Sequence, residues 1–235
     1  MRILAFETSA KAAGAALHDG SKLLAESYQN TGLTHSQTLM VMAQDLLKQC
    51  GLTAQDVTHV AVAAGPGSFT GVRIGVAAAK GFAWGKALPC YGVSTLEAMA
   101  KGLGVFEGTV CAVMDARRSQ VYNALFQVKN GIYTRICQDR AISLEELGQE
   151  LQALSSPIYL VGDGSSLTHK AFTGTNPKLV LPPEFRMHQR GAGVALVACE
   201  KIAAGEAPSG GELEPNYLRL SQAEREKIER QKKEN

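Results

Sequence analysis

The sequence predicts an α/β protein built from two copies of one fold, each with a mixed sheet. In each half, strand-like segments joined by hairpins come first, and helices then alternate with strands. The chain has 235 residues, of which 45% are hydrophobic, enough for a core in each half. We expect a first unit at 1–104 and a second at 105–220, with a late helix able to pack back on the first.

Strand and turn signals are strongest at the beginning of the first unit. The pair Asp19-Gly20 lies between two strand-like runs and favours a tight hairpin turn, because both central residues of that turn adopt positive φ. Three strands joined by hairpins are therefore expected at 2–6, 12–18 and 22–28. A helix should begin near His35 and end before Gly51, because apolar residues recur between them at helical spacing.

A glycine-rich turn at 65–75 follows the apolar run 60–64 and leads into a helix expected from about Ser68, a suitable N-cap, to Trp84. Such a turn either holds an anion on backbone N–H groups or lets the helix pack unusually closely. The chain lacks the Gly-Lys-Ser/Thr of a P-loop. It also lacks an acidic residue about 20 positions later, which a dinucleotide fingerprint requires.

The helix after this turn carries a stripe of small residues. Gly71, Gly75, Ala78, Ala79 and Phe82 fall along one side, where small side chains let another backbone approach. A glycine inside a helix costs roughly 1 kcal/mol relative to alanine, and close packing would offset that cost. Packing in a tight core or across an interface is therefore favoured over anion binding.

The second unit is expected to repeat the order of elements seen in the first. Its strands are predicted at 109–114, 121–128, 132–137 and 157–161. Its helices are predicted at 143–154, 166–172 and 193–204. Ser143 and Glu146 resemble a capping box at the start of the first of these helices.

Composition and net charge limit the classes of protein to which the chain can belong. The formal net charge is +2, so no strong overall field marks the chain as a nucleic-acid binder. No apolar run approaches the roughly 18 residues that span a bilayer, and Glu7 comes too early for a secretory signal. The five widely spaced cysteines are typical of reduced thiols, so we expect a cytoplasmic protein. Residues 221–235 form a charged tail, either solvated or folded against a partner.

Two strand ends carry candidate chemistry. Glu7-Thr8-Ser9 closes the first strand, where it forms either a hydrogen-bonded turn or a metal–phosphate site. Asp115-Ala116-Arg117-Arg118 closes the first strand of the second unit, where the arginines bind phosphate or form salt bridges. The turn Gly162-Asp163-Gly164-Ser165 is a weaker match to turns that approach an adenosine in duplicated nucleotide-binding folds.

His35 is not expected to bind a metal. A metal site on a helix commonly uses two histidines four residues apart. The positions three and four residues after His35 hold Thr38 and Leu39, which are poor ligands. The sequence also lacks a recognisable nucleophile–base pair and a Gly-x-Ser-x-Gly elbow, so we assign no catalytic residue and no metal ligand.

Six short segments match one known family when they are taken together in order. They are ILAFETS (3–9), HSQ (35–37), GPGSFTGVRIG (65–75), AKG (79–81), MDAR (114–117) and PNYLR (215–219). The long glycine motif is the most specific of them. With these segments the chain resembles the bacterial TsaB family, also called YeaZ, from the first strand to about Arg219.

The resemblance implies the fold of the actin, sugar-kinase and Hsp70 group (ASKHA), with two RNase H-like halves. The family works in making N6-threonylcarbamoyladenosine (t6A) at adenosine 37 of tRNAs that read codons beginning with A. Its members are similar to the catalytic subunit TsaD, but here the second histidine of the HxxxH motif of TsaD is replaced by Leu39. Members pair with TsaD through helices of the N-terminal unit, are joined by the ATPase TsaE, and form homodimers when alone.

By this resemblance the expected function is that of a non-catalytic scaffold and activator, which meets tRNA indirectly through the complex and has no membrane partner. The candidate partner interface comprises residues of two helices: His35, Leu39, Phe69, Gly71, Val72, Gly75, Ala78, Ala79 and Phe82. No cofactor is expected on the chain alone, although ATP or ADP could lie at the interface of the complex.

Two alternatives stay open. One is an ATP-dependent phosphotransferase or hydrolase of the same fold, with Glu7 and Asp115 at the cleft between the halves. The candidate cleft residues for that chemistry are Glu7, Thr8, Ser9, Asp115, Arg117 and Arg118. The other is an M22-type peptidase, which rests only on older naming of the family.

Overall fold

The computed structural model describes residues 1–219, and the charged tail predicted at 221–235 lies outside them. The first half of the chain forms a five-stranded mixed sheet in the order β3-β2-β1-β4-β5. Its strands are β1 (Ile3–Glu7), β2 (Ala13–His18), β3 (Leu23–Gln29), β4 (His59–Ala63) and β5 (Cys90–Val93). The predicted hairpins are confirmed, because β1, β2 and β3 pair antiparallel in sequence order, while β4 joins β1 in parallel.

The second half repeats this plan around a six-stranded sheet in the order β11-β10-β6-β7-β8, with β9 also paired to β7. Its strands are β6 (Gly108–Asp115), β7 (Gln120–Lys129), β8 (Ile132–Arg135), β9 (Arg140–Ser143), β10 (Ile158–Val161) and β11 (Leu179–Val180). Here β6 takes the place of β1, since it pairs antiparallel with β7 and parallel with β10.

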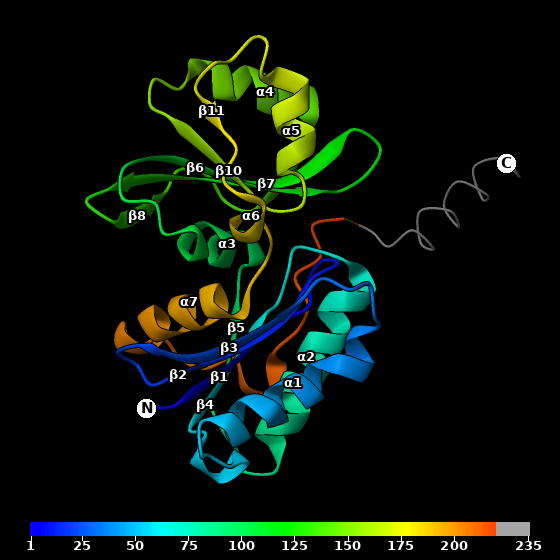
Figure 1. The fold of residues 1–235 in the computed structure, drawn as a ribbon, viewed down its shortest axis with the longest axis vertical. Coiled ribbons are helices and arrows are strands. Elements are labelled where there is room, and N and C mark those ends of the chain that lie inside the picture. The colour runs from blue at the N-terminus through cyan, green and yellow to red at the C-terminus, as the bar shows by residue number, and fades with distance from the viewer. Residues whose placement is uncertain (220–235) are drawn as a thin grey trace, which may run out of the picture.

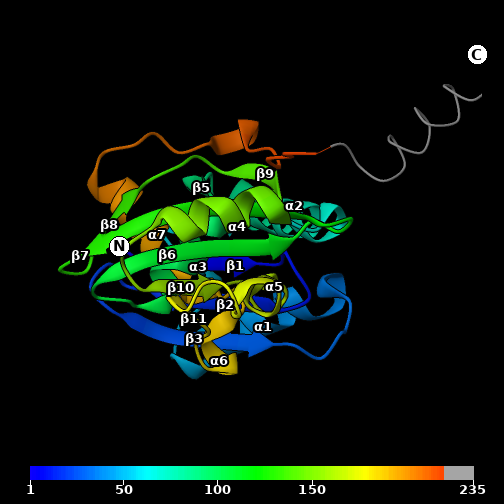
Figure 2. The ribbon, with the colours of Figure 1, turned by 90° about the horizontal axis from the view of Figure 1, so that it is seen from above.

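Each sheet has an outer face covered by two helices. On the first sheet these are α1 (His35–Gln49) and α2 (Phe69–Trp84), and the turn η1 (Ala54–Asp56) follows α1. On the second sheet they are α4 (Leu144–Ala153) and α5 (Ser165–Phe172), which lie nearest the viewer in Figure 2. The predicted cap and capping box are confirmed, since Ser68 accepts a hydrogen bond from the Gly71 N–H group, and Ser143 and Glu146 bond reciprocally.

Two helices lie between the sheets and connect the halves (Figure 1). Helix α3 (Thr95–Leu103) follows the first sheet in sequence, yet its apolar residues pack on β6 and β7 of the second. Helix α7 (Gly191–Ala203) follows the short α6 (Glu184–Met187) of the second half and packs on β1 and β2 of the first. The chain ends its described part with η2 (Gly210–Glu212) and an extended segment.

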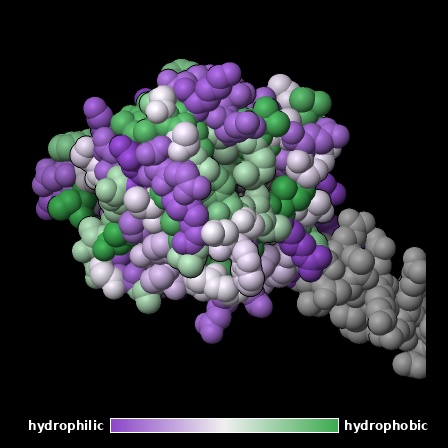
Figure 3. Space-filling view, turned by 90° about the horizontal axis from the view of Figure 1, so that it is seen from below, coloured by the Kyte–Doolittle hydropathy of each residue, from purple (hydrophilic) through white to green (hydrophobic). Residues whose placement is uncertain are grey.

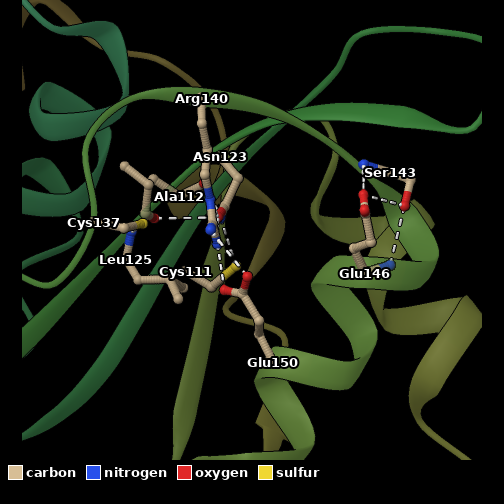
Figure 4. A network of polar contacts seen from close by, with 10 residues as sticks. Cys111, Ala112, Asn123, Leu125, Cys137, Arg140, Ser143, Glu146 and Glu150 are labelled. Carbon is tan, nitrogen blue, oxygen red and sulfur yellow. Dashed lines mark hydrogen bonds and ion pairs between the residues drawn. The ribbon is translucent and has the colours of Figure 1, made fainter.

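A polar network centred on the buried Asn123 joins several elements of the second half (Figure 4). The Asn123 side-chain amide donates to the Ala112 carbonyl at 3.0 Å, and Arg140 donates to Asn123 Oδ1 at 3.1 Å. Arg140 also pairs with Glu150 of α4, so β9 and α4 are tied to the middle of β7. Burial raises the pKa of the neighbouring Cys111 thiol to about 12, so this thiol stays protonated and serves as a small apolar group.

Among residues 1–219, every helix is too short or too polar to cross a lipid bilayer. The five cysteines are all free thiols.

Candidate functional site

A cleft of about 1070 Å³ opens between the two halves, at the ends of β1 and β6. Its lining comes from the β1–β2 turn, the loop that leads into α1, the start of α2, the β6–β7 hairpin, Asp163, residues 188–189 and the segment 216–219. The carboxyl ends of β1 and β6, and of the strands parallel to them, lie at this edge, which is where open α/β sheets usually hold their ligands. The cleft is therefore the candidate site of the molecule.

Glu7 lies just beneath the floor of this cleft. Its side chain is fully buried, and its Oε1 accepts a hydrogen bond from the Ser9 N–H group at 2.6 Å. Within residues 1–219 the second oxygen, Oε2, has no hydrogen-bond partner. Burial, with a smaller contribution from Asp163, raises the pKa of Glu7 to about 7. Because its carboxyl group is fully buried, Glu7 does not present an oxygen to a ligand in the cleft.

Asp115 occupies the corresponding place in the second half but is exposed to the cleft. Its Oδ1 accepts a hydrogen bond from the Arg117 N–H group at 2.7 Å. The hairpin then turns through three consecutive residues with positive φ, at 61° for Arg117 and 56° for both Arg118 and Ser119. This turn exposes Arg117 and Arg118, and it places Arg117 in the lining of the cleft together with Asp115.

The glycine-rich turn serves close packing within the chain. A Cβ atom on Gly71 would overlap the Thr8 carbonyl, and one on Gly75 would overlap the Thr8 hydroxyl. The Thr8 hydroxyl donates to the Gly71 carbonyl at 2.8 Å, and the Ser68 N–H group donates to the Ser9 carbonyl at 2.6 Å. Helix α2 can therefore lie directly on the end of β1 only because these positions carry no side chain.

This packing corrects most of the predicted partner interface. Gly71, Val72, Gly75 and Ala79 face the first sheet and are buried in the chain's own core. Leu39 of α1 is also buried there, with 1% of its side chain exposed. The prediction was wrong for these five residues, because a residue that the monomer already buries has no surface left for a partner.

His35 and Phe69 line the cleft instead of an outer surface. The His35 Nε2–H group donates to the Ala10 carbonyl at 2.7 Å, which fixes the start of α1 to the β1–β2 turn. The Phe69 ring stacks on the Tyr217 ring with 4.4 Å between centroids, and Arg73 lies over Phe69 at 3.9 Å. These two residues therefore hold the cleft wall together.

Ala78 and Phe82 are half-buried and pack against the margin of the first core, where the Phe82 ring meets the Phe6 ring edge-on. Around them the outer faces of α1 and α2 expose apolar residues that the sequence pattern did not single out: Met40, Val41, Ala77, Gly81 and Trp84. A shallow groove of about 610 Å³ runs between the two helices beside Phe82. Figure 3 views this end of the molecule, where apolar surface in green lies among hydrophilic side chains. We name this surface the α1/α2 face.

One signal in the sequence could have revealed the α1/α2 face. Helix α2 is apolar nearly all round, with Arg73 and Lys80 as its only charged residues. A helix of that kind is buried on every side in the working molecule. Here the first sheet, α1 and residues 211–213 cover part of α2, whereas Ala77, Gly81 and Trp84 stay exposed.

The segment 213–219, which we call the strap, crosses from one half to the other. Leu213 is buried in the first core, and the Asn216 N–H group donates to the Ala64 carbonyl at 2.6 Å. The Arg219 guanidinium donates to the Ala116 carbonyl at 2.5 Å on the second half. The strap therefore forms one wall of the cleft and contacts both halves.

The predicted adenosine-type turn at 162–165 also reaches the cleft. Asp163 accepts a hydrogen bond from the Gln189 side chain at 3.2 Å, and burial raises the pKa of Asp163 above its ordinary value. Gly162 and Gly164 press against the last residues of β6, much as Gly67 and Gly71 press against the end of β1. In the part of the chain that is described, no group of three or more His, Cys, Asp or Glu residues is placed to hold a metal ion.

Comparison with solved structures identifies the class of protein. The chain superposes on YeaZ from Pseudomonas aeruginosa with a TM-score of 0.76 at 24% identity, over 92% of this chain and 99% of that one. It also superposes on component A of (R)-2-hydroxyglutaryl-CoA dehydratase from Acidaminococcus fermentans with a TM-score of 0.51 at 12% identity, over 86% and 99% of the two chains. The predicted ASKHA fold is confirmed: two related α/β halves enclose a cleft.

Sequence comparison then gives the family. A family model described as TsaD, tRNA N6-adenosine threonylcarbamoyltransferase, matches residues 28–225. The tRNA threonylcarbamoyladenosine biosynthesis protein TsaB of Bacillus subtilis is 36% identical over 99% of this chain and all of its own length. TsaB of Escherichia coli is 35% identical over 93% and 95% of the two chains. The chain belongs to the TsaB family, whose members take part in forming threonylcarbamoyladenosine in tRNA.

Proposed function

We propose that this chain is a non-catalytic subunit of the t6A machinery, which activates threonylcarbamoyl transfer to adenosine 37 of tRNAs reading codons that begin with A. It would act by pairing with a TsaD-like catalytic subunit and by recruiting a TsaE-like ATPase. Membership of the TsaB family supports the pathway. The replacement of a second metal-ligand histidine by Leu39, which points into the core, supports a role without transfer chemistry of its own.

The observation that carries the pairing is the α1/α2 face. Val41 of α1 is 55% exposed and Trp84 of α2 is 86% exposed. The small residues Ala77 and Gly81 of α2 are also exposed. An exposed face that combines large apolar side chains with small residues on an adjacent helix is suited to docking another helix pair. The catalytic subunit is the proposed occupant, and a second copy of this chain would use the same face when the subunit is alone.

In this proposal the isolated chain neither binds a nucleotide nor catalyses a reaction with one. Glu7, the acid that an ASKHA phosphotransferase would need at the cleft, is buried and has a pKa raised to about 7. We place any ATP or ADP at the interface of the assembled complex. Calorimetry of the isolated chain with Mg-ATP should therefore give no saturable heat, and a saturable signal would favour the phosphotransferase alternative.

The pairing is tested by Ala77→Arg, which places a charge in the centre of the α1/α2 face. The matched control is Ala153→Arg, an exposed alanine at the end of α4 on the other half. Ala77→Arg should abolish co-elution with a purified TsaD-like subunit and reduce t6A formation in the reconstituted reaction at least tenfold, whereas Ala153→Arg should change neither. Normal co-elution of Ala77→Arg would refute the assignment of this face.

A further inference from the structure

Two turns face the cleft from equivalent positions in the two halves, and each exposes a cation. Lys11 lies in the turn between β1 and β2, and Arg117 lies in the turn between β6 and β7. Both side chains are exposed and line the cleft. Arg219 of the strap lies close to the second turn, because it donates to the Ala116 carbonyl. Cations therefore approach the cleft from both halves and from the strap.

Among residues 1–219, these three cations have no carboxylate partner, in contrast to three arginines elsewhere in the molecule. Arg135, Arg140 and Arg190 each form an ion pair with a carboxylate. Among the described residues, no ion pair involves Lys11, Arg117 or Arg219. The nearest acid of the second turn, Asp115, has its Oδ1 occupied by the Arg117 backbone N–H group. The Lys11 ammonium and the Arg117 guanidinium are thus available to an anionic ligand, and the Arg219 guanidinium has further donors besides the one bonded to the Ala116 carbonyl.

An aromatic surface and unsatisfied polar atoms accompany these cations. Tyr217 is 39% exposed and stacks on Phe69 beside the cleft, with its hydroxyl fixed by a 2.7 Å hydrogen bond from Arg73. Inside the cleft, the Ser9 hydroxyl and Gln189 Oε1 are buried and have no hydrogen-bond partner within residues 1–219. Buried polar atoms without partners are rare in native proteins, and they point to a ligand that supplies the missing bonds.

We propose that this cleft binds single-stranded RNA, with Lys11, Arg117 and Arg219 holding the phosphate backbone of the tRNA anticodon loop and Tyr217 contacting an unstacked base. The inference rests on the proposed function and gives this chain a direct contact with the substrate RNA. Proteins recognise looped RNA by cations along the backbone, aromatic rings under splayed bases and hydrogen bonds to base edges, and all three elements are present here. An acidic peptide would pair with the cations but would not account for the exposed Tyr217 ring or for the unpaired Ser9 hydroxyl and Gln189 Oε1.

The test uses the complex of this chain with a TsaD-like subunit and a fluorescein-labelled 17-nucleotide anticodon stem-loop that carries adenosine at position 37. The variant Lys11→Glu/Arg117→Glu is compared with Lys129→Glu/Lys170→Glu, which makes the same change in net charge at exposed lysines away from the cleft. By anisotropy at 100 mM KCl, the cleft variant should bind at least tenfold more weakly, and the control should lose less than twofold. The slope of log affinity against log salt should fall by about 1.4 in the cleft variant, because two phosphate contacts are lost.

A second variant separates stacking from charge. Tyr217→Leu should weaken RNA binding about fivefold or more without changing the salt slope, because stacking on a base is insensitive to salt. Equal losses in the cleft and control variants, or unchanged affinity in both cleft variants, would overturn the RNA contact. Loss of co-elution with the catalytic subunit in Lys11→Glu/Arg117→Glu would instead assign the cleft to a protein partner and also overturn it. Co-elution and t6A formation by the wild-type chain, measured in the same preparations, report separately on the proposed function.

Discussion

In both halves, the last residue of the first strand is a carboxylic acid that accepts a hydrogen bond from the N–H group two residues further on. Glu7 accepts from Ser9 at 2.6 Å, and Asp115 accepts from Arg117 at 2.7 Å. Glu7 is fully buried, whereas Asp115 is exposed to the cleft. The repeated fold therefore keeps the hydrogen bond of the turn while the environment of its acid differs, and only the second half presents its carboxylate to the cleft.

The outer helices of the two halves differ in the same way. Helices α1 and α2 have 15 and 16 residues and present apolar side chains outward, including Val41 and Trp84. Helices α4 and α5 have 10 and 8 residues, and the outer side of α4 is polar, with Glu145 and Glu150 exposed. The first half is thus suited to docking through its outer face, and the second half to contacts at the cleft.

The largest expected effect separates the inner and outer sides of α2. Gly75→Leu should destabilise the chain by more than about 4 kcal/mol, because the new side chain overlaps the Thr8 hydroxyl and lies against Val62. At Gly81, six residues later, an added Cβ atom would meet no atom within 4 Å, so Gly81→Leu should stabilise the isolated chain slightly through helix propensity. Urea unfolding followed by circular dichroism checks both, and a stable Gly75→Leu variant would contradict the packing of α2 on β1.

The second-largest expected effect is the pH dependence of stability that the buried Glu7 causes. The pKa of Glu7 is about 7 in the folded chain against 4.5 for a free glutamate, so the folded state holds its proton more tightly. The stability that the protonated form contributes is fully present below about pH 4.5 and is lost as pH rises to about 7. From the size of the pKa shift, the free energy of unfolding falls by about 3 kcal/mol over this range. Glu7→Gln should remove this loss, so that the variant gains on the wild type between pH 4.5 and 8 in urea unfolding.

Asp115→Asn is the matched control in the second half, because its carboxyl group is exposed and accepts an equivalent hydrogen bond. Asp163 also has a raised pKa from burial, so Asp163→Asn is measured alongside to separate its share. If the stability of wild type and of Glu7→Gln depended equally on pH, Glu7 would be ionised throughout this range. Other interactions would then offset the cost of burying its charge.

The sequence predicted what depends on local signals. The hairpins followed from Asp19-Gly20 and the strand patterns, and the helix starts followed from Ser68 and Ser143. The sequence did not show which side of α2 faces inward, because an apolar helix without a polar side gives no contrast to orient it. It also could not show that Arg219 reaches Ala116, because that contact joins residues 103 positions apart.

The smallest expected effect compares the caps of α2 and α4. Ser143→Ala should cost about 1 kcal/mol, because the exposed start of α4 depends on the reciprocal bonds between Ser143 and Glu146. Ser68→Ala should cost less, since its hydroxyl lies 3.3 Å from the Gly71 N–H group and the start of α2 is also held by the Ser68 N–H bond to Ser9. Ser143→Asp should restore stability, because aspartate caps as well as serine. Equal losses at both sites would mean that close packing on β1 contributes nothing to the start of α2, and that the two halves hold their helices in the same way.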